Sequence, residues 1–373
     1  MRRWMGRLVL LVVGLLLGLV LAEVGARVVA PTPAAELLGE PTRDATPGLY
    51  TTHETLGHVP TPGYDRSWPT PEGSIRVRIG PDGYRLPAAD PALPRWIAVG
   101  DSYTMAVQAP EDRTFAALLA ERRGVSFVNG GVDGYSTWQA AMRYEKLDDL
   151  VQAEGVVYVL FEGNDLTDNQ VFLGRMRFSA DAEGRLTLPP ANPHFTGQAL
   201  VPWRSATLME HLRARSLLLA AIHVVRHRPE VVQHGTLDRY RRETMAMTYV
   251  GRGDRQRLLA DLRPALLYLK RAAAERGDRL LVALAPAPWM LDPALSEATL
   301  VALGQQPGQA DLPAFRADLK AAVEREGLAT CDLGPSLAAS AQAGEHPFLR
   351  YDGHWSKRGH EVVAEALNAC LGG

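Results

Sequence analysis

The sequence predicts an α/β fold built on a mainly parallel sheet with helices on both faces. Five short apolar runs that stop at Gly, Asn, Pro or Asp predict strands, at 95–101, 125–132, 155–165, 278–288 and 327–335. Segments with helical spacing of apolar residues lie between them, at 113–123, 137–151 and 255–277. Apolar strands that alternate with helices are typical of a parallel sheet covered on both faces. In such sheets, ligands bind beyond the carboxyl ends of the strands.

Length and composition are ordinary for a globular protein. The chain has 373 residues, of which 46% are hydrophobic and 22% are charged, so it can bury a large core and is not disordered throughout. The formal net charge of -2 indicates no nucleic-acid partner. Two cysteines, Cys331 and Cys370, are too few for a zinc cluster or a disulfide framework. A single bridge between them and two buried thiols are both compatible with the sequence.

Residues 1–30 have the pattern of a targeting segment. Three arginines, Arg2, Arg3 and Arg7, precede an unbroken apolar run over 8–22. This pattern is typical of a cleaved signal peptide or an uncleaved single-pass signal anchor. We therefore expect a protein in the periplasm or at the extracytoplasmic face of the cytoplasmic membrane, which contacts the membrane through this segment. A buried helix of a cytosolic domain is the alternative.

The rest of the chain divides into two further parts. Residues 31–90 are predicted to be a Pro/Gly-rich spacer, irregular over 31–71, and then an N-terminal hairpin in which apolar residues alternate with arginines before a GPDG turn. Residues 91–373 are the predicted α/β domain. Residues 170–253 interrupt its rhythm of strands and helices, and we interpret them as an insertion with one helix over 210–230.

The stretch VGDSYTMAV, residues 99–107, places a serine where chemistry is possible. Ser102 directly follows the first strand of the predicted sheet. A serine there is a candidate nucleophile only if a base and an orienting acid reach it. Both residue types stand in YDGHWSKRGH, residues 351–360, as Asp352 and His354. In a turn, this spacing lets the carboxylate accept a hydrogen bond from the imidazole Nδ1 while Nε2 faces the serine hydroxyl.

Two loops offer donors for a negatively charged oxygen. The stretch VNGGVDGYS, residues 128–136, contains glycines whose backbone N–H groups approach a reacting carbonyl without a side chain in the way. Asn164, in EGND, carries an amide that can donate to a developing oxyanion. Both loops follow predicted strands, so we expect them at the same edge of the sheet as Ser102.

In this order the motifs resemble those of the SGNH, or GDSL-type, hydrolase superfamily. GDSYT resembles its first block, the glycine of VDGYS its second, GND its third, and DGH with the following WSKRGH its last. The resemblance implies a three-layer α/β/α, flavodoxin-like fold with no cofactor and no metal. It implies Ser102 as nucleophile, His354 as general base and Asp352 as its orienting acid. The implied oxyanion hole consists of the Ser102 N–H, the Gly134 N–H and the Asn164 side chain.

Two positions depart from the common family pattern. The third block begins with Glu162 where the family commonly has glycine, and only Gly353 separates Asp352 from His354 where the family commonly has two residues. The short Asp-x-His form followed by Trp resembles the SGNH-like proteins that acetylate exported polysaccharides such as alginate. In those proteins the Asp-x-His pair precedes the serine, so this second resemblance covers the local motif only.

Several residues near the predicted cleft have two interpretations each. His360 is either a metal ligand beside His354 and Asp352 or, more simply, a surface histidine. Asp133 and Asp165 either contact substrate or cap backbone N–H groups. Three tryptophans either stack on a sugar or pack in the core, and these are Trp138, Trp289 and Trp355.

The expected function is that of an exported serine esterase, which removes O-acyl groups, O-acetyl groups above all, from carbohydrate through an acyl-enzyme. The alternatives are an O-acyltransferase to envelope polysaccharide, a lipase-like or thioesterase-like lipid hydrolase, and a non-catalytic carbohydrate-binding subunit. The acceptor depends on the shape of the cleft and on access of water, so the motifs leave hydrolysis and transfer both open. We expect an acylated carbohydrate or another ester as partner, and no nucleic acid; the oligomeric state stays open.

Overall fold

The structure is a computed structural model, and it describes most of the chain. The described residues are 2–29, 48–70, 73–87, 90–176, 252–302, 311–349 and 353–372, with short pieces at 179–181, 183–184, 186–187, 216, 218–219, 306 and 308. The chain divides into two compact units, Met1–Ala45 with Arg204–Arg239 and Thr46–Trp203 with Tyr240–Gly373. Most of the insertion predicted over 170–253 lies outside the described residues, and so does its predicted helix over 210–230 except for residues 216, 218 and 219.

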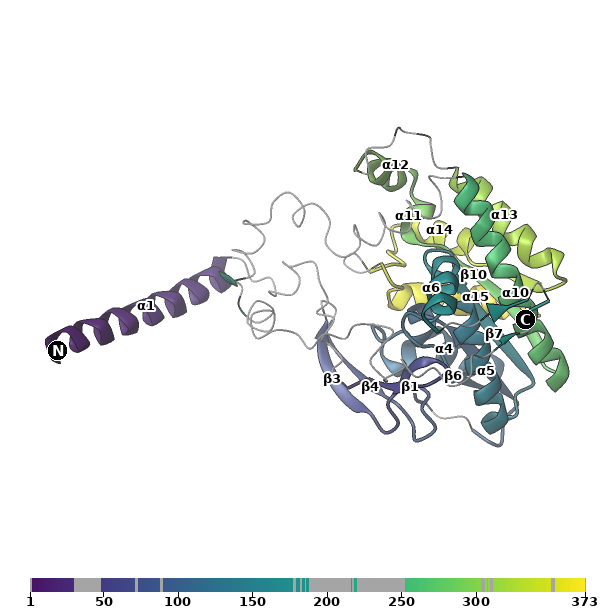
Figure 1. Cartoon of the computed structure of the whole chain (residues 1–373), viewed down its shortest axis with the longest axis horizontal. Helices are drawn as coiled ribbons and strands as arrows, with labels where there is room; N and C mark the ends of the chain where they lie inside the picture. The colour runs from purple at the N-terminus through teal and green to yellow at the C-terminus, as the bar shows by residue number, and fades with distance from the viewer. Residues whose placement is uncertain are drawn as a thin grey trace. The chain divides into compact units, whose positions relative to one another are not determined.

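The second unit is built on a five-stranded, all-parallel sheet (Figure 1). Its strands are β5 (Arg95–Gly100), β6 (Ser126–Asn129), β7 (Gly155–Phe161), β10 (Arg279–Ala285) and β11 (Ala329–Asp332). They lie in the order β11-β10-β7-β5-β6. Counted along the chain, this is the order 2-1-3-4-5 of flavodoxin-like sheets. The predicted fold class, and all five strands that it was based on, are confirmed.

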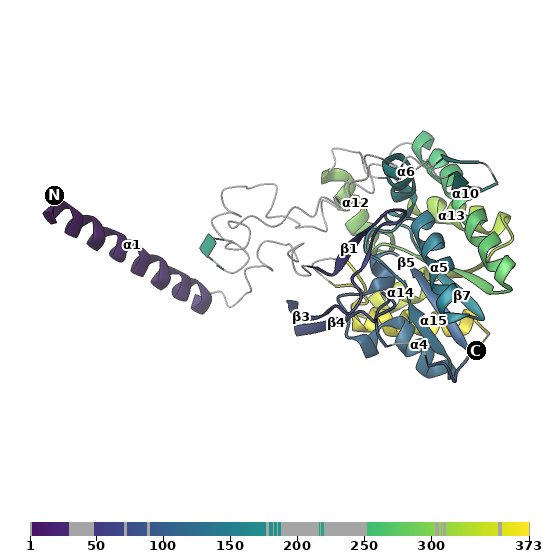
Figure 2. The same cartoon turned by 60° about the horizontal axis from the view of Figure 1, so that its bottom comes forward.

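Two groups of packed helices enclose this sheet (Figure 2). One group consists of α4 (Phe115–Arg123), α14 (Gly334–Gln342) and α15 (Lys357–Cys370), and the other of α5 (Thr137–Val151), α6 (Asp165–Met176), α10 (Arg252–Arg276) and α13 (Leu312–Arg325). Polar caps set where several of them begin. Ser136 and Gln139 form a capping box at α5, and the hydroxyls of Thr114 and Ser356 accept from backbone N–H groups at α4 and α15.

The N-terminal region of the second unit contains more strand than predicted. Strand β1 (Tyr50–His53) pairs antiparallel with β2 (Gly57–Pro60), and β3 (Asp65–Thr70) pairs with β4 (Gly73–Arg78). The prediction of irregular structure over 31–71 is therefore wrong for its second half. The predicted hairpin partner is wrong as well, because β4 pairs with the segment before it. The GPDG turn forms, but it carries only the single bridge between Ile79 and Arg85.

The remaining elements are short, apart from one long helix in the first unit. They are α3 (Ser102–Met105), η1 (Glu111–Arg113), β8 (Ser179–Ala180), β9 (Leu186–Thr187), α11 (Pro288–Leu291) and α12 (Pro293–Ala302). The long helix, α1 (Arg2–Val29), covers the predicted targeting segment. Across the described ranges, no helix combines the length and apolar character that a membrane span needs.

The core of the second unit surrounds the sheet and takes in all three tryptophans of the predicted cleft. Every residue of β7 is buried. Trp138, Trp289 and Trp355 are each at most 1% exposed. Side chains buried to this degree have no free ring face, so the alternative in which they stack on a sugar is wrong and they pack in the core.

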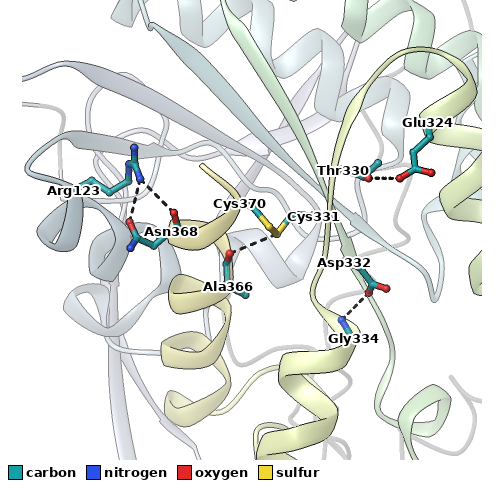
Figure 3. Close-up of a disulfide and its surroundings, with 9 residues drawn as sticks. All are labelled: Arg123, Glu324, Thr330, Cys331, Asp332, Gly334, Ala366, Asn368 and Cys370. Carbon is teal, nitrogen blue, oxygen red and sulfur yellow. Dashed lines mark hydrogen bonds between the residues drawn. A yellow bond between two sulfur atoms is a disulfide. The ribbon is translucent and has the colours of Figure 1, made fainter. Parts of the chain in front are cut away.

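A disulfide joins the last strand to the last helix (Figure 3). Cys331 lies in β11, and Cys370 is the final residue of α15. Of the two possibilities left open by the sequence, the structure therefore has the bridge. It fixes the end of α15, the helix that begins just after the predicted catalytic histidine.

Removal of the disulfide is expected to destabilise the second unit. The bridge spans 39 residues, and the loop-entropy model gives it about 4 kcal/mol of stabilisation, because the cross-link restricts the unfolded chain. The measurement is urea unfolding of the wild type and of a Cys331→Ser/Cys370→Ser variant, each with and without reductant. Reductant should lower the stability of the wild type and leave the double variant unchanged. Equal stabilities in all four samples would show that the bridge contributes nothing.

Candidate active site

Ser102 lies where strand β5 ends and the short helix α3 begins. The turn between them is tight, because a Cβ on Gly100 would lie 2.7 Å from the carbonyl oxygen of Val159 in the neighbouring strand. Asp101 caps α3, and its carboxylate accepts from the Tyr103 N–H at 2.9 Å. The glycine and the aspartate of GDS therefore have local structural roles, and the serine between strand and helix stays half-buried at the sheet edge.

The structure brings His354 onto Ser102, as the sequence predicted. His354 Nε2 lies 2.8 Å from Ser102 Oγ. Two backbone hydrogen bonds close the loop that carries His354. The Leu349 N–H donates to the His354 carbonyl at 2.8 Å, and the Gly353 N–H donates to the Leu349 carbonyl at 3.2 Å. The Tyr103 hydroxyl donates to the carbonyl of Gly353 at 2.7 Å, so the residue after the serine also fixes the residue before the histidine. A hydroxyl within hydrogen-bond distance of an imidazole nitrogen can transfer its proton to that nitrogen.

The other ring nitrogen of His354 contacts a residue that the sequence analysis did not single out. His354 Nδ1 lies 3.2 Å from the Nε2 group of Gln108, in the loop after α3. Asp352, predicted to orient the ring, lies outside the described residues, and its role stays a prediction. A lone glutamine in a loop carries no sequence signal for such a contact, and only the fold brings Gln108 and His354 together.

Apart from Ser102, the residues of the predicted oxyanion hole are Gly134 and Asn164, which lie after the two strands that flank β5. Gly134 follows β6 and has a φ of +71°, a backbone conformation that favours glycine, with open space beside its Cα. Asn164 follows β7, and its Nδ2 group donates to Asp168 at 2.8 Å. An amide nitrogen carries two hydrogens, so one donor remains. Neither residue is hydrogen bonded to Ser102 among the described contacts, and their oxyanion role stays a prediction.

Two buried aspartates next to the site have structural partners. The Asp165 carboxylate accepts from the Tyr158 hydroxyl at 2.9 Å and from the Phe161 N–H at 3.0 Å, which confirms its interpretation as a cap of a backbone N–H group. Burial raises the pKa of Asp165 well above its usual range. Burial also raises the pKa of Asp101 to about 7, although the N–H of Tyr103 and the charge of His354 act against it. The site therefore lies beside carboxyl groups that are poorly solvated.

The unusual Glu162 has an electrostatic explanation. Its carboxylate is 1% exposed and accepts from Arg316 of α13, with Nε at 2.7 Å and an Nη group at 3.0 Å. The same guanidinium contacts Asp332 at the end of β11. Burial raises the pKa of Glu162 in spite of this partner. The departure from glycine thus places an ion pair between β7, α13 and β11, directly before the turn that carries Asn164.

The N-terminal strands hold the loop that carries Gly134. His58 of β2 is buried and its Nε2 lies 2.9 Å from the carbonyl oxygen of Asp133. The Tyr135 hydroxyl donates to the His58 carbonyl at 2.6 Å, and the Gln139 amide donates to that of Leu56 at 2.8 Å. The region predicted to be a spacer therefore belongs to the support of the site. For Asp133, His58 contacts the backbone carbonyl, and the two predicted roles of its carboxylate, contact with substrate and a cap of backbone N–H groups, both stay predictions.

His360 is not the surface histidine that we expected. It is 2% exposed, its ring stacks on that of Phe115, and its Nδ1 accepts from the Phe115 N–H at 3.3 Å. Burial lowers the pKa of His360 to about 3, so the ring is neutral. In the part of the chain that the structure describes, no group of three or more His, Cys, Asp or Glu residues has the arrangement of a metal site.

Comparison with known proteins finds one matching family model. Residues 246–372 match the SGNH hydrolase-like domain of the acetyltransferase AlgX. This stretch includes β10, β11, α15 and His354. It also includes both cysteines of the disulfide. A search of curated proteins finds no match.

Solved structures with some similarity include two hydrolase-type proteins. A member of the lipolytic G-D-S-L family from Veillonella parvula has 15% identity and a TM-score of 0.36, over 73% of this chain and 94% of the other. An alpha/beta hydrolase enzyme from the metagenome of Lake Arreo, Spain, has 15% identity and a TM-score of 0.34, over 75% and 95% of the two chains. Similarity at this level carries no argument of its own. The family match over residues 246–372 and the flavodoxin-like strand order support the resemblance to the SGNH hydrolase superfamily that the ordered motifs predicted.

Proposed function

We propose that this protein is an exported serine esterase, which removes O-acyl groups, O-acetyl groups above all, from carbohydrate. The family model that matches residues 246–372 supports an esterase or acyltransferase that acts on acyl groups. The observation that carries the proposal is the 2.8 Å contact between Ser102 Oγ and His354 Nε2 at the carboxyl end of strand β5.

The proposed reaction uses His354 as a base and then as an acid. His354 Nε2 takes the Ser102 proton while Oγ bonds to the acyl carbon, and the carbonyl oxygen becomes an oxyanion. The Ser102 and Gly134 N–H groups and the Asn164 amide are the proposed donors to that oxyanion, and one such donor is worth about 3 kcal/mol. The imidazolium then protonates the leaving sugar oxygen as the ester bond breaks. Water, deprotonated by His354, releases the acid from Ser102, and the proton returns to Oγ.

Two observations support carbohydrate as the carrier of the acyl group. The matched family model is that of an acetyltransferase, AlgX. The Asp352-Gly353-His354-Trp355 stretch resembles the corresponding motif of proteins that acetylate exported polysaccharides.

The apolar segment of α1 behind three arginines supports export, because such a pattern directs the following chain out of the cytoplasm.

A second candidate is an O-acyltransferase to an envelope polysaccharide. The description of the matched model as an acetyltransferase favours it. Both candidates share the acyl-enzyme and differ only in whether water or a sugar hydroxyl resolves it. A lipid hydrolase and a non-catalytic binding subunit are outcomes of the experiments below.

Loss of the serine or the histidine should abolish ester hydrolysis. Ser102→Ala removes the attacking oxygen and His354→Ala removes the base, so each should lower kcat on p-nitrophenyl acetate by about 10³-fold or more. Ser336→Ala, on α14, is a matched control and should keep wild-type activity. Circular dichroism checks that each variant is folded. Near wild-type turnover by either site variant would place catalysis elsewhere, and no turnover by the wild type on acetyl, acyl-lipid or thioester substrates would favour a binding subunit.

The acyl acceptor can be identified with a labelled donor. We expect radiolabelled acetyl from a chromogenic ester to appear as free acetate, at a rate that does not depend on added envelope oligosaccharides, because water resolves the acyl-enzyme of an esterase. Chromatography of the products measures this directly. Label found mainly on the sugar, with slow hydrolysis in its absence, would replace the esterase by the transferase.

Export can be tested with a reporter. Alkaline phosphatase fused to the carboxyl end should be active, because this reporter forms its disulfides only outside the cytoplasm. A fusion that lacks residues 1–30 is the control and should be inactive. An inactive full-length fusion that accumulates to the same level as the control would contradict export.

A further inference from the structure

We propose that His58 is a positioning residue for the oxyanion donor at Gly134. Its ring N–H holds the carbonyl of Asp133 and thereby fixes the peptide group whose other end is the Gly134 N–H. The inference rests on the proposed function, since the oxyanion role of that N–H belongs to it.

The peptide group between Asp133 and Gly134 is the middle of a β-turn. The Tyr135 N–H donates to the Val132 carbonyl at 3.2 Å and closes the turn, and Gly134 has the positive φ, +71°, that the third position of a type II turn requires. Types I and II differ chiefly in which way the middle peptide faces, and a glycine at the third position permits both. The turn by itself therefore leaves the direction of the Gly134 N–H open.

Both ends of this turn are anchored to the site and to strand β2. The Val132 N–H donates at 3.1 Å to the carbonyl of Gly100, two residues before Ser102. At the other end, the Tyr135 hydroxyl donates to the His58 carbonyl at 2.6 Å. These bonds fix where the turn lies, but neither of them involves the middle peptide.

The His58 side chain holds the middle peptide. Its Nε2 lies 2.9 Å from the Asp133 carbonyl oxygen, and because a carbonyl oxygen can only accept, Nε2 carries the hydrogen and donates. The N–H of a trans peptide points opposite to its C=O, so the Gly134 N–H is directed away from the His58 ring. The orientation of the peptide is thus set by a residue that lies 75 positions earlier in the chain.

The surroundings of His58 keep its ring in this role. The residue is 5% exposed, and its ring packs edge-on against the rings of Tyr50 and Tyr135. Burial lowers the pKa of His58, so the ring is neutral and has a single N–H. Among the described residues, Nδ1 has no hydrogen-bond partner, which agrees with a ring that carries its hydrogen on Nε2.

This contact suits an oxyanion donor in two ways. A fixed N–H needs no reorientation when negative charge develops, and a hydrogen bond to the carbonyl polarises the peptide and makes its N–H a stronger donor. Gly134 is exposed, and among the described residues its N–H has no hydrogen-bond partner. It can therefore donate to a substrate.

The kinetic test removes the ring N–H and then restores a donor. His58→Leu should lower kcat on p-nitrophenyl acetate by about 10- to 100-fold with little change in KM, because the bound ester carries no oxyanion yet. His58→Gln has an amide N–H that reaches nearly the same place and should restore most of the lost kcat. The matched control is His53→Leu in the same hairpin, where the ring accepts from the Thr55 and Leu56 N–H groups, and it should keep the wild-type kcat. Circular dichroism checks that each variant is folded.

NMR follows the peptide itself, without substrate. Labels of ¹³C at the Asp carbonyls and ¹⁵N at Gly leave the signals of the three Asp-Gly steps of the chain, and that of Gly134 is the one lost in Asp133→Asn. The ¹⁵N resonance of Gly134 should move in His58→Leu, because its peptide carbonyl loses the bond that polarises it, and should return toward the wild-type position in His58→Gln. It should stay in place in His53→Leu.

The wild type alone supplies a measurement that needs no folded variant. Long-range ¹H–¹⁵N spectra of the imidazoles should show the His58 ring with hydrogen on Nε2 and none on Nδ1. A hydrogen on Nδ1, an unmoved Gly134 resonance in folded His58→Leu, or an equal loss of kcat in the Leu and Gln variants would overturn the inference. A Gly134 resonance that moves as expected in a protein that hydrolyses no ester would support the role of His58 in fixing the peptide and reject the proposed esterase.

Discussion

The candidate active site depends on one hydrogen bond, between His354 Nε2 and Ser102 Oγ at 2.8 Å. Its partners are 252 residues apart in the chain, so the fold must bring the end of β5 and the last loop together. The parallel sheet achieves this because β5 lies between β6 and β7 and the carboxyl ends of all five strands lie on the same edge. The loop of His354 is then held from both sides, by Tyr103 at Gly353 and by the start of α15 at the Ser356 cap.

Support for the site comes from parts of the chain that contribute no catalytic group. Arg85 holds the turn of Gln108, and His58 holds the backbone beside Gly134. Glu162 and Arg316 form a buried ion pair directly before the turn of Asn164. Each loop that carries a candidate catalytic group thus has its own polar anchor. A site on loops keeps the geometry that proton transfer requires only when such anchors restrict it.

The sequence predicted those features that depend on local pattern. The five apolar runs became the five strands, and the GDS and DGH motifs led to Ser102 and His354. Both signals depend on residues close together in the chain, namely the apolar run of a buried strand and the spacing within a motif. The sequence did not predict the features that depend on packing between residues far apart in the chain. The strands β1, β2 and β3 form in a segment rich in Pro and Gly because β1 pairs with β2 and β3 pairs with β4. His360 is buried because α15 turns it toward Phe115. Gln108 had no sequence signal, since its partner is 246 residues away.

The central claim is that Ser102 is a nucleophile activated by His354, and covalent labelling tests it most directly. An organophosphonate ester is incubated with the folded wild-type protein, and peptide mass spectrometry locates the adduct. We expect one adduct per chain, on Ser102, and a much slower reaction in His354→Ala because the proton acceptor is gone. Absence of an adduct on Ser102 in the folded wild type, or equal labelling in the presence and absence of His354, would contradict it.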